Sequence, residues 1–337
     1  MKKFTIILLS VILVMVSFCG CKKEDDGVLA NEYSVTTDSN NDIYAEVPLT
    51  YTEGFAADIA VIGENEFNSD GSEELFSESA LLIDASTGKV LFMKNPHKKQ
   101  YPASTTKVLT SMLALKYGDH NAVRTVGDEV IINESNVILC DYRMGDKIPM
   151  DIALHGSLMM SGNDAAAVLG LFAAPTLSEL ADLMNKEAAS LGATNSHFVN
   201  PHGLYDENHY TTAYDLYLIF NEAIKYPDFV NTLACKKYTN TFIRKTAYAE
   251  YTIGCTYTNS NQYVTGDLPT PAGVHVVGGK AGYTELARRS YVMLANANGH
   301  EYIIITMRCD STQQMYSDLT YLLNKIPVND KNYADNE

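Results

Sequence analysis

The chain has 337 residues, 46% of them hydrophobic and 20% charged, which is enough to bury the core of one large domain or two modest ones. This composition excludes a wholly disordered, collagen-like or disulfide-dense protein. The net charge of −16 argues against a nucleic-acid-binding protein, which would need a basic face. Fifteen Asp and Glu but no Lys or Arg lie between Glu24 and Glu78, so most of the acidity belongs to a leader region.

The first 21 residues have the pattern of an export signal. Lys2 and Lys3 precede an apolar run at residues 4–18, and small residues follow it. The run is too short and wrongly flanked for a membrane-spanning helix, which favours a cleaved signal peptide. Its end resembles a bacterial lipoprotein cleavage site, in which Cys21 becomes the acylated first residue and anchors the chain to the membrane. An ordinary signal peptide or an uncleaved anchor is the alternative, and each interpretation places the remainder outside the cytoplasm.

The rest of the chain divides into three parts by composition. Residues 22–78 form an acidic linker with few apolar residues, in which the apolar patch at 55–62 can make a short strand. Residues 79–326 are expected to be the globular domain. Residues 327–337 make a polar tail.

Within this domain, two short strands at residues 80–84 and 90–94 form a predicted hairpin. Helical periodicity then predicts four helices, and late apolar runs predict three strands and a closing helix. Strands at both ends with helices between them indicate an α+β domain, whose antiparallel sheet is assembled from distant pieces and carries a helical insert. The predicted helices are 104–117, 151–172, 177–191, 211–226 and 311–325, and the late strands are 274–278, 290–295 and 302–307.

The cysteines beyond the leader show no metal-binding pattern, because the spacing of Cys140, Cys235, Cys255 and Cys309 fits no common zinc site. Cys235 and Cys255 flank a predicted hairpin made by residues 238–242 and 249–253. A disulfide between them is one prediction, and two separate buried thiols are the other.

Three short motifs carry the chemistry: STTK at residues 104–107, SGND at 161–164 and KAGYT at 280–284. In the first, Ser104 and Lys107 are three residues apart on a predicted helix and project from the same face. An amine that has lost its proton can take the proton of the hydroxyl, and the start of the helix favours the negative charge that develops. As an alternative, Ser104 is a simple helix cap and Lys107 an exposed lysine; the other two motifs argue against it.

These motifs resemble the Ser-x-x-Lys, Ser-x-Asn and Lys-Thr-Gly signatures of the penicillin-recognising serine acyltransferases. The surrounding residues resemble one branch, the D-alanyl-D-alanine carboxypeptidases, over roughly residues 79–325. YPASTTK at 101–107, SGNDAA at 161–166 and LGATNSHFVNPHGL at 191–204 carry this resemblance, together with the hairpin at 84–90. It implies a β-lactamase/transpeptidase-like α/β sandwich, with about five antiparallel strands flanked by helices and a helical subdomain.

The resemblance also implies a mechanism and a substrate. Ser104 would attack the penultimate D-Ala carbonyl of a peptidoglycan stem peptide ending in D-Ala-D-Ala, and β-lactam antibiotics would trap it. Lys107 would be the general base, and Ser161 would relay a proton to the leaving amine. The backbone N–H groups of Ser104 and Tyr283 would form the oxyanion hole. The residues expected to bind the substrate are Asn163, Lys280, Gly282, Tyr283 and Thr284. The resemblance implies no metal or cofactor.

Two departures from the family pattern lie close to this predicted site. Ala281 stands where the family has Thr or Ser, whose hydroxyl helps to hold the substrate carboxylate. Arg288 and Arg289 add bulk and charge where the family has smaller residues. These departures are expected to affect substrate affinity and the catalytic rate more than the fold.

Other interpretations of the polar and aromatic residues are weaker. His197, His202 and His209 cluster in sequence, but their spacing fits no common metal motif. The aromatic region at 238–263 is better explained by hairpin packing than by a carbohydrate platform.

The leading hypothesis is therefore an active, lipid-anchored carboxypeptidase that trims peptidoglycan. Its alternative from another class is a catalytically weakened homologue that binds peptidoglycan or a partner protein, which the departures at Ala281 and Arg288 favour. A β-lactamase is the runner-up among enzymes, although no deacylating Glu on a separate loop is found. A fluorescent penicillin distinguishes the three by label on Ser104 and the rate at which it is lost.

Overall fold

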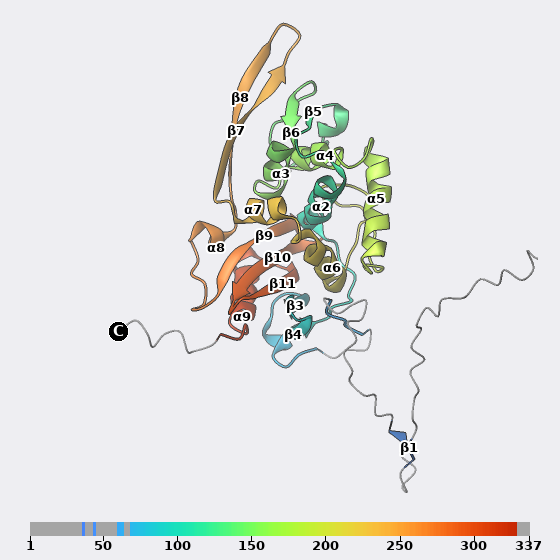
Figure 1. The fold of residues 1–337 in the computed structure, drawn as a ribbon, viewed down its shortest axis with the longest axis vertical. Helices are drawn as coiled ribbons and strands as arrows, with labels where there is room; N and C mark the ends of the chain where they lie inside the picture. Colours follow the sequence, from blue (N-terminus) through green and yellow to red (C-terminus); the bar gives the residue numbers. More distant parts are fainter. Residues whose placement is uncertain (1–35, 38–42, 45–58, 64–67, 329–337) are drawn as a thin grey trace, which may run out of the picture. The chain divides into compact units, whose positions relative to one another are not determined.

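The computed structural model describes residues 36–37, 43–44, 59–63 and 68–328 (Figure 1). The predicted signal peptide, the acylation site at Cys21 and most of the acidic linker and polar tail lie outside these residues. The chain divides into two units, residues 1–54 and 55–337. In the first, β1 (Thr36–Thr37) pairs antiparallel with β2 (Ile43–Tyr44). Within the described part of the chain, no helix is long and apolar enough to cross a membrane.

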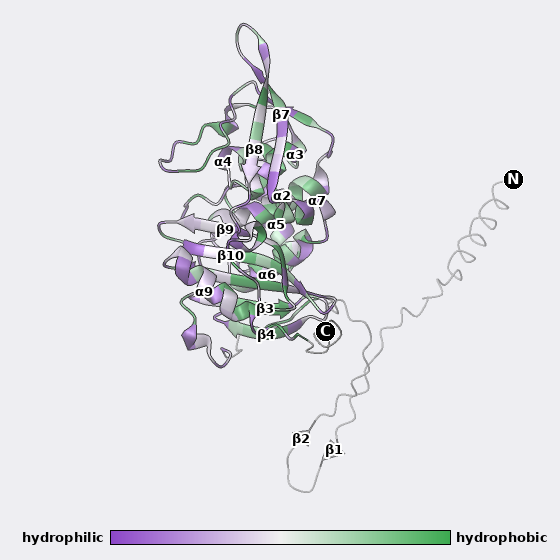
Figure 2. Ribbon diagram, turned by 90° about the vertical axis from the view of Figure 1, so that its left-hand side faces the viewer, coloured by the Kyte–Doolittle hydropathy of each residue, from purple (hydrophilic) through white to green (hydrophobic). Residues whose placement is uncertain are grey.

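A five-stranded antiparallel sheet, in the order β4-β3-β11-β10-β9, organises the second unit (Figure 1). Its central strands consist mostly of hydrophobic residues (Figure 2), and nearly all of these are buried, because helices cover both faces of the sheet. The sheet thus joins an early hairpin to late strands, which confirms the predicted α+β architecture. The strands are β3 (Ser79–Asp84), β4 (Lys89–Lys94), β9 (His275–Thr284), β10 (Arg288–Ala297) and β11 (His300–Cys309).

Alternate side chains of β3 enter two hydrophobic clusters on opposite faces of the sheet. Leu81 and Ile83 pack on the side of α6 (Ala213–Ala223), together with the helical subdomain. Leu82 packs on the side of α9 (Thr312–Leu323). The sheet is therefore the middle layer between two layers of helices.

The helical subdomain is built around α2 (Lys107–Tyr117), whose first nine residues are all buried. A four-stranded sheet in the order β5-β6-β7-β8 accompanies its helices, and the long β7–β8 hairpin extends from it (Figure 1). The sequence analysis missed β5, β6, α7 and the short helix α8. The remaining elements are α3 (Met150–Leu158), α4 (Asn163–Gly170), α5 (Leu177–Ser190), α7 (Pro227–Ala234), α8 (Gln262–Thr265), β5 (Val123–Thr125), β6 (Lys147–Pro149), β7 (Lys237–Lys245) and β8 (Glu250–Thr258), with 3-10 turns η1 (Ser72–Glu74), η2 (Ala103–Thr106) and η3 (Asp128–Val130).

The single helix predicted at 151–172 is wrong, because the chain breaks it into α3 and α4. At the break Ser161 has a positive φ of 64°, which is incompatible with a continuous right-handed helix. The neighbouring loop fills the space, since a Cβ on Gly162 would lie 2.5 Å from Sγ of Cys140. The break places the second motif at a corner instead of along a helix.

Part of the predicted linker is packed on the domain. Residues 59–62, the described part of the strand expected at 55–62, form no strand; instead Ala60 donates its N–H to the hydroxyl of Tyr217 in α6. Farther on, Leu75 is buried, and Ser77 donates two hydrogen bonds to Asp318 of α9. The acidic composition predicts a linker up to residue 78 because the few residues that make these contacts are outnumbered by acidic and polar ones.

The predicted Cys235–Cys255 disulfide is absent, and the separate-thiol alternative is correct. Cys235 ends α7, whereas Cys255 lies opposite Asn240 in the β7–β8 hairpin. The register therefore places the two cysteines five residues out of alignment. Cys140 and Cys309 also carry free thiols.

Candidate active site

The nucleophile candidate stands where η2 runs into α2. Lys107, the first residue of α2, places its Nζ 2.8 Å from Oγ of Ser104, one turn earlier. The preceding Ala103 has a positive φ of 50°, and a Cβ on Gly203 would collide with its carbonyl oxygen. The loop at 200–204 thus packs directly against this strained turn. Glycine is required at position 203 for two reasons: its backbone lies against Ala103, and its own φ is +84°.

Lys107 is completely buried, and its amine has three polar neighbours. Nζ lies 2.8 Å from Oγ of Ser104, from Oδ1 of Asn163 and from the backbone oxygen of His202. Burial, followed by the charge of Lys280, holds the pKa of Lys107 well below its usual range. The amine is therefore suited to act as a base near neutral pH.

The second and third motifs meet through Lys280 and Ser161. Lys280 of β9 is buried and donates hydrogen bonds to Oγ of Ser161, at 2.9 Å, and to the backbone oxygen of Ala281, at 2.7 Å. Burial lowers the pKa of Lys280 to about 7. The residues predicted from three separate motifs thus form two hydrogen-bonded groups, Ser104–Lys107–Asn163 and Ser161–Lys280. The charge of Lys280 acts on Lys107, so the two groups are neighbours.

The backbone of β9 closes the site beside the nucleophile. β9 is an edge strand of the sheet, and its Gly282 is so close to η2 that a Cβ would lie 3.0 Å from the backbone nitrogen of Ser104. The carbonyl of Ala281 faces Lys280 across this edge, and backbone groups two residues apart point to the same edge. The N–H of Tyr283 therefore points to the same edge of β9 as the carbonyl of Ala281, which is the edge that Lys280 contacts.

The side chains of Tyr283 and Thr284 do not join the group. The Tyr283 ring is half exposed and stacks under the guanidinium of Arg289 at 4.6 Å. The hydroxyl of Thr284 accepts the N–H of Ala287 and stabilises the β9–β10 turn. Arg288, at the other side of that turn, has a positive φ of 57° and points to the exposed Asp310.

Asp164 is a positioning residue that the sequence analysis did not single out. Its buried carboxylate accepts the N–H groups of Cys140 and Tyr142, at 2.8 and 3.0 Å. Burial raises the pKa of Asp164, and these hydrogen bonds oppose that shift. The carboxylate ties the 138–142 loop to the start of α4, beside Ser161 and Asn163. Asp164 belongs to the SGND motif, but its hydrogen-bond partners Tyr142 and Cys140 are 22 and 24 residues away in the sequence, so the motif alone does not reveal its role.

Two of the three clustered histidines, His202 and His209, are held in structural surroundings. His209 accepts the N–H of Val199 at Nδ1, so its Nε2 carries the proton and donates to the hydroxyl of Thr106 at 2.8 Å. Burial lowers the pKa of His209 to about 4 and that of His202 to about 3, so both are neutral at pH 7. His202 serves the site through its backbone oxygen, a role that no side-chain motif can reveal. No cluster of three or more metal-ligating side chains occurs in the described residues.

Comparison with known proteins agrees with this geometry. Residues 66–311 match the D-alanyl-D-alanine carboxypeptidase family. The chain is 28% identical over 255 residues to the carboxypeptidase DacF of Bacillus subtilis, covering 74% of this chain and 61% of that protein. It is 30% identical over 234 residues to DacB2 of Mycobacterium tuberculosis, covering 68% and 74%.

A solved mutant of the Streptomyces K15 DD-transpeptidase has the same fold. It superposes with a TM-score of 0.66 at 25% identity, covering 74% of this chain and 97% of that one. The chain spans less than two thirds of the length of the B. subtilis relative. Because the family match includes most of the sequence and all three motifs, the chain belongs to the D-alanyl-D-alanine carboxypeptidase family.

Proposed function

We propose that this protein is a serine D-alanyl-D-alanine carboxypeptidase that removes the terminal D-Ala from peptidoglycan stem peptides and binds penicillin. The observation that carries the proposal is the fully buried Lys107 amine within hydrogen-bond distance of the Ser104 hydroxyl. A buried amine of lowered pKa beside a hydroxyl is the arrangement that activates a serine nucleophile without a histidine.

The neighbours of Lys107 orient its lone pair. A neutral amine has two N–H bonds and one lone pair. Oδ1 of Asn163 and the oxygen of His202 are acceptors only, so they take the two N–H bonds. The lone pair then faces Ser104, accepts its hydroxyl proton, and leaves Oγ free to attack the carbonyl of the penultimate D-Ala.

The attack forms a tetrahedral intermediate whose oxygen carries negative charge. The backbone N–H groups of Ser104 and Tyr283 would stabilise this oxyanion from the two walls of the cleft. Collapse of the intermediate breaks the peptide bond, and the proton taken from Ser104 must reach the leaving amine. The Ser161 hydroxyl is the proposed relay, because Lys280 fixes its oxygen at 2.9 Å.

Lys280 in its protonated form would also pair with the free carboxylate of the terminal D-Ala. Water then hydrolyses the ester on Ser104 and regenerates the enzyme. A β-lactam places its carbonyl and carboxylate in the same positions, so it would acylate Ser104 by the same steps. Apart from that water molecule, each step uses side chains and backbone groups of the chain.

The experiment is to incubate the protein with a fluorescent penicillin and, separately, to measure D-Ala released from an acetylated D-Ala-D-Ala peptide. We expect stoichiometric label, slow loss of that label, and D-Ala release, all abolished in the Ser104→Ala variant. Label without D-Ala release would replace the proposal by the weakened, ligand-binding homologue. Rapid loss of label would indicate a β-lactamase.

We further infer that the protein works outside the cytoplasm and is held at the membrane by a lipid on Cys21. The lysines at positions 2 and 3, the apolar run after them and the Gly20-Cys21 pair support this inference. The acyl chains of a lipidated cysteine bury enough CH₂ groups to give stable attachment. In the Cys21→Ala variant the protein should leave the membrane fraction, and unchanged fractionation would count against lipidation.

A further inference from the structure

The two N–H groups of the proposed oxyanion hole lie on segments that are far apart in the sequence. Ser104 belongs to η2, and Tyr283 lies near the end of β9, just before the β9–β10 turn at residues 285–287. Gly282 limits how closely these segments approach, since a Cβ there would lie 3.0 Å from the nitrogen of Ser104. A steric limit prevents closer approach but does not prevent separation. An attractive link between the two segments is formed by Glu78 and Arg308.

The side chain of Arg308, in β11, joins the β9–β10 turn to Glu78. Its Nη1 donates a 2.9 Å hydrogen bond to the backbone oxygen of Leu286 in the turn. Its Nε donates a second hydrogen bond, also at 2.9 Å, to Oε1 of Glu78. The rigid guanidinium presents these two nitrogens at a fixed spacing, which the single amine of a lysine cannot reproduce. Arg308 therefore holds the turn and the carboxylate at a fixed distance from each other.

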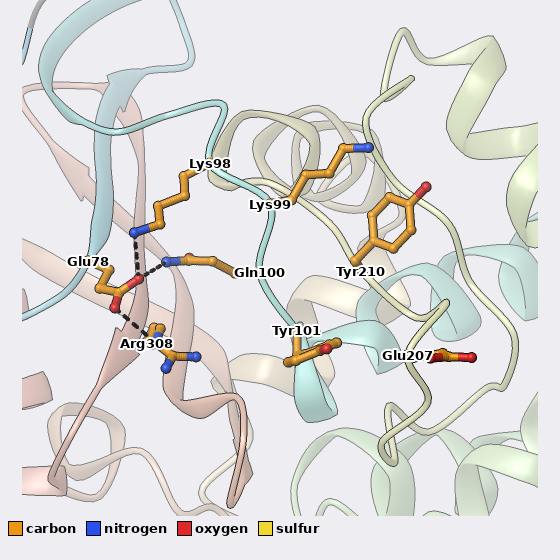
Figure 3. A pocket seen from close by; sticks show the side chains of 8 residues that line it. All are labelled: Glu78, Lys98, Lys99, Gln100, Tyr101, Glu207, Tyr210 and Arg308. Atoms are coloured by element: carbon orange, nitrogen blue, oxygen red, sulfur yellow. Dashed lines mark hydrogen bonds and ion pairs between the residues drawn. The ribbon is translucent and has the colours of Figure 1, made fainter.

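The other oxygen of Glu78 holds the segment that precedes the nucleophile. Oε2 lies 3.0 Å from Nζ of Lys98 and accepts a hydrogen bond from Nε2 of Gln100 at 3.2 Å (Figure 3). Gln100 is buried four residues before the nucleophile, and two backbone hydrogen bonds fix it to Thr211. The Glu78 carboxylate therefore has Arg308 on one oxygen and the segment before the nucleophile on the other.

The Glu78 carboxylate is ionised at neutral pH. Burial raises the pKa of Glu78, but the hydrogen bonds from Lys98 and Gln100 and the charges of Lys98 and Arg308 outweigh burial, so the pKa lies below its usual value. These residues line a cavity of about 460 Å³, together with Tyr101 (Figure 3). Partly exposed ion pairs of this kind contribute little to the free energy of unfolding, because water screens them. Replacing Glu78 or Arg308 should therefore leave the protein folded.

The backbone at Arg308 is strained in a way that aims its side chain. Ser290 of β10 lies opposite both Met307 and Arg308 of β11, which is a β-bulge. Arg308 has a φ of 58°, in the left-handed region that disfavours a residue with a side chain. Bulges redirect side chains, and a strained residue persists only where its surroundings favour it. For Arg308, these surroundings are the β9–β10 turn and Glu78.

We propose that Glu78 and Arg308 are a positioning pair for the oxyanion hole, which ties the β9–β10 turn, and with it the N–H of Tyr283, to the segment before Ser104. Neither side chain contacts the substrate. The inference rests on the proposed acylation of Ser104 and adds the contact that keeps the two donors at a fixed separation. Without this pair the turn moves away from the nucleophile, and the acylation transition state loses part of its stabilisation.

The test compares penicillin labelling of the wild-type protein with that of two variants. In Glu78→Gln the amide keeps the shape of the carboxylate but has one acceptor oxygen, so it serves only one side of the link. Arg308→Lys keeps the positive charge but loses the fork. We expect the maximal labelling rate of each variant to fall about tenfold, less than the 10²–10³-fold cost of removing an oxyanion donor. The half-saturating penicillin concentration should stay unchanged, because Lys280 is intact.

Two further readouts separate positioning from a purely structural role. Partial unfolding would lower the amount of label but not the rate at which folded molecules acquire it. The Glu78→Gln/Arg308→Lys double variant should be no slower than the slower single variant, because both substitutions break the same link. Glu250→Gln removes the exposed Lys147–Glu250 ion pair in the four-stranded sheet. It is the matched control and should be labelled at the wild-type rate.

The results distinguish a failure of the pair from a failure of the activity. A wild-type labelling rate in Glu78→Gln or in Arg308→Lys would overturn the pair, as would losses that multiply in the double variant. A changed half-saturating concentration with an unchanged maximal rate would assign the two residues to substrate binding and also overturn it. In each case, labelling of the wild-type protein leaves the proposed function intact. If the wild-type protein takes no label, the proposed function itself fails, and the inference fails with it.

Discussion

Gly282 lies so close to Ser104 that the absence of a side chain is itself part of the site. A Cβ at position 282 would lie 2.8 Å from the oxygen of Pro102 and 3.0 Å from the nitrogen of Ser104. Backbone atoms cannot move aside as the end of a flexible side chain can. The spacing between the edge strand and η2 is therefore set by this glycine.

The Gly282→Ala variant should lose acylation while remaining folded. The methyl group would push β9 away from η2 and separate the two N–H groups of the proposed oxyanion hole. The loss of one such donor costs about 10²–10³-fold in rate. The measurement is the second-order rate of penicillin labelling, with circular dichroism to check the fold. Gly254→Ala in β8 is the matched control, because a Cβ there meets nothing within 4 Å. Normal labelling of Gly282→Ala would contradict this account of the hole.

The pH dependence of acylation should be bell-shaped. The rate should rise as Lys107 loses its proton, at a pH well below the usual range of a lysine because burial and Lys280 lower its pKa. It should fall as Lys280 loses its positive charge above about pH 7, since burial lowers the pKa of Lys280 to about 7. Stopped-flow labelling from pH 5 to 10 measures both limbs.

Replacing Lys280 by Arg tests the upper limb, because a guanidinium keeps its charge over this whole range. The Lys280→Arg variant should lose the fall above about pH 7, whatever its absolute rate. A variant that keeps that fall would assign it to a different group.

Ala281→Thr should improve cleavage of peptides with a free terminal carboxylate. The added hydroxyl can donate one charge-assisted hydrogen bond, which contributes about 1.5–3 kcal/mol, or roughly ten- to a hundredfold in affinity. Ala281 is half-buried beside the cluster on the α9 side of the sheet, where a β-branched residue suits the strand. Kinetics with a carboxylate substrate and its terminal amide separate the two contributions, since equal gains on both would show that position 281 acts through packing.

Asp164→Asn should destabilise the protein and slow acylation together. The amide keeps the shape of the carboxylate but has one acceptor oxygen for the N–H groups of Cys140 and Tyr142, so one buried donor loses its partner at a cost of about 1–3 kcal/mol. Urea unfolding measures the free energy of unfolding. Asp228→Asn, at an exposed pair with His120, is the control and should change it by less than about 1 kcal/mol. An unchanged stability of Asp164→Asn would show that the loop is held by other contacts.

Local sequence patterns predicted the sheet and most helices because their signals are periodic and continuous. The run at 302–307 and the hairpin at 80–94 have the apolar patterns of strands, and β11 and β3 do pair, through Ile304 and Leu82. The spacing of Ser104 and Lys107 also fixed their contact, since residues three apart on a helix are always neighbours. The family resemblance predicted that Ser161 and Lys280 belong to the same site.

The other features of the site depend on contacts between segments that are far apart in the sequence, which no local pattern contains. The break at Ser161 depends on a loop some twenty residues earlier, and the buried state of Lys107 depends on the loop that carries His202. The cavity lined by Tyr101 takes its charges from Glu78 before β3, from Lys98 and Lys99, from Glu207 and from Arg308 of β11. The sequence by itself determined which groups can react. Tertiary packing decided that the amines of Lys107 and Lys280 are buried and which groups surround them, because burial and orientation arise only when separate segments enclose the same atoms.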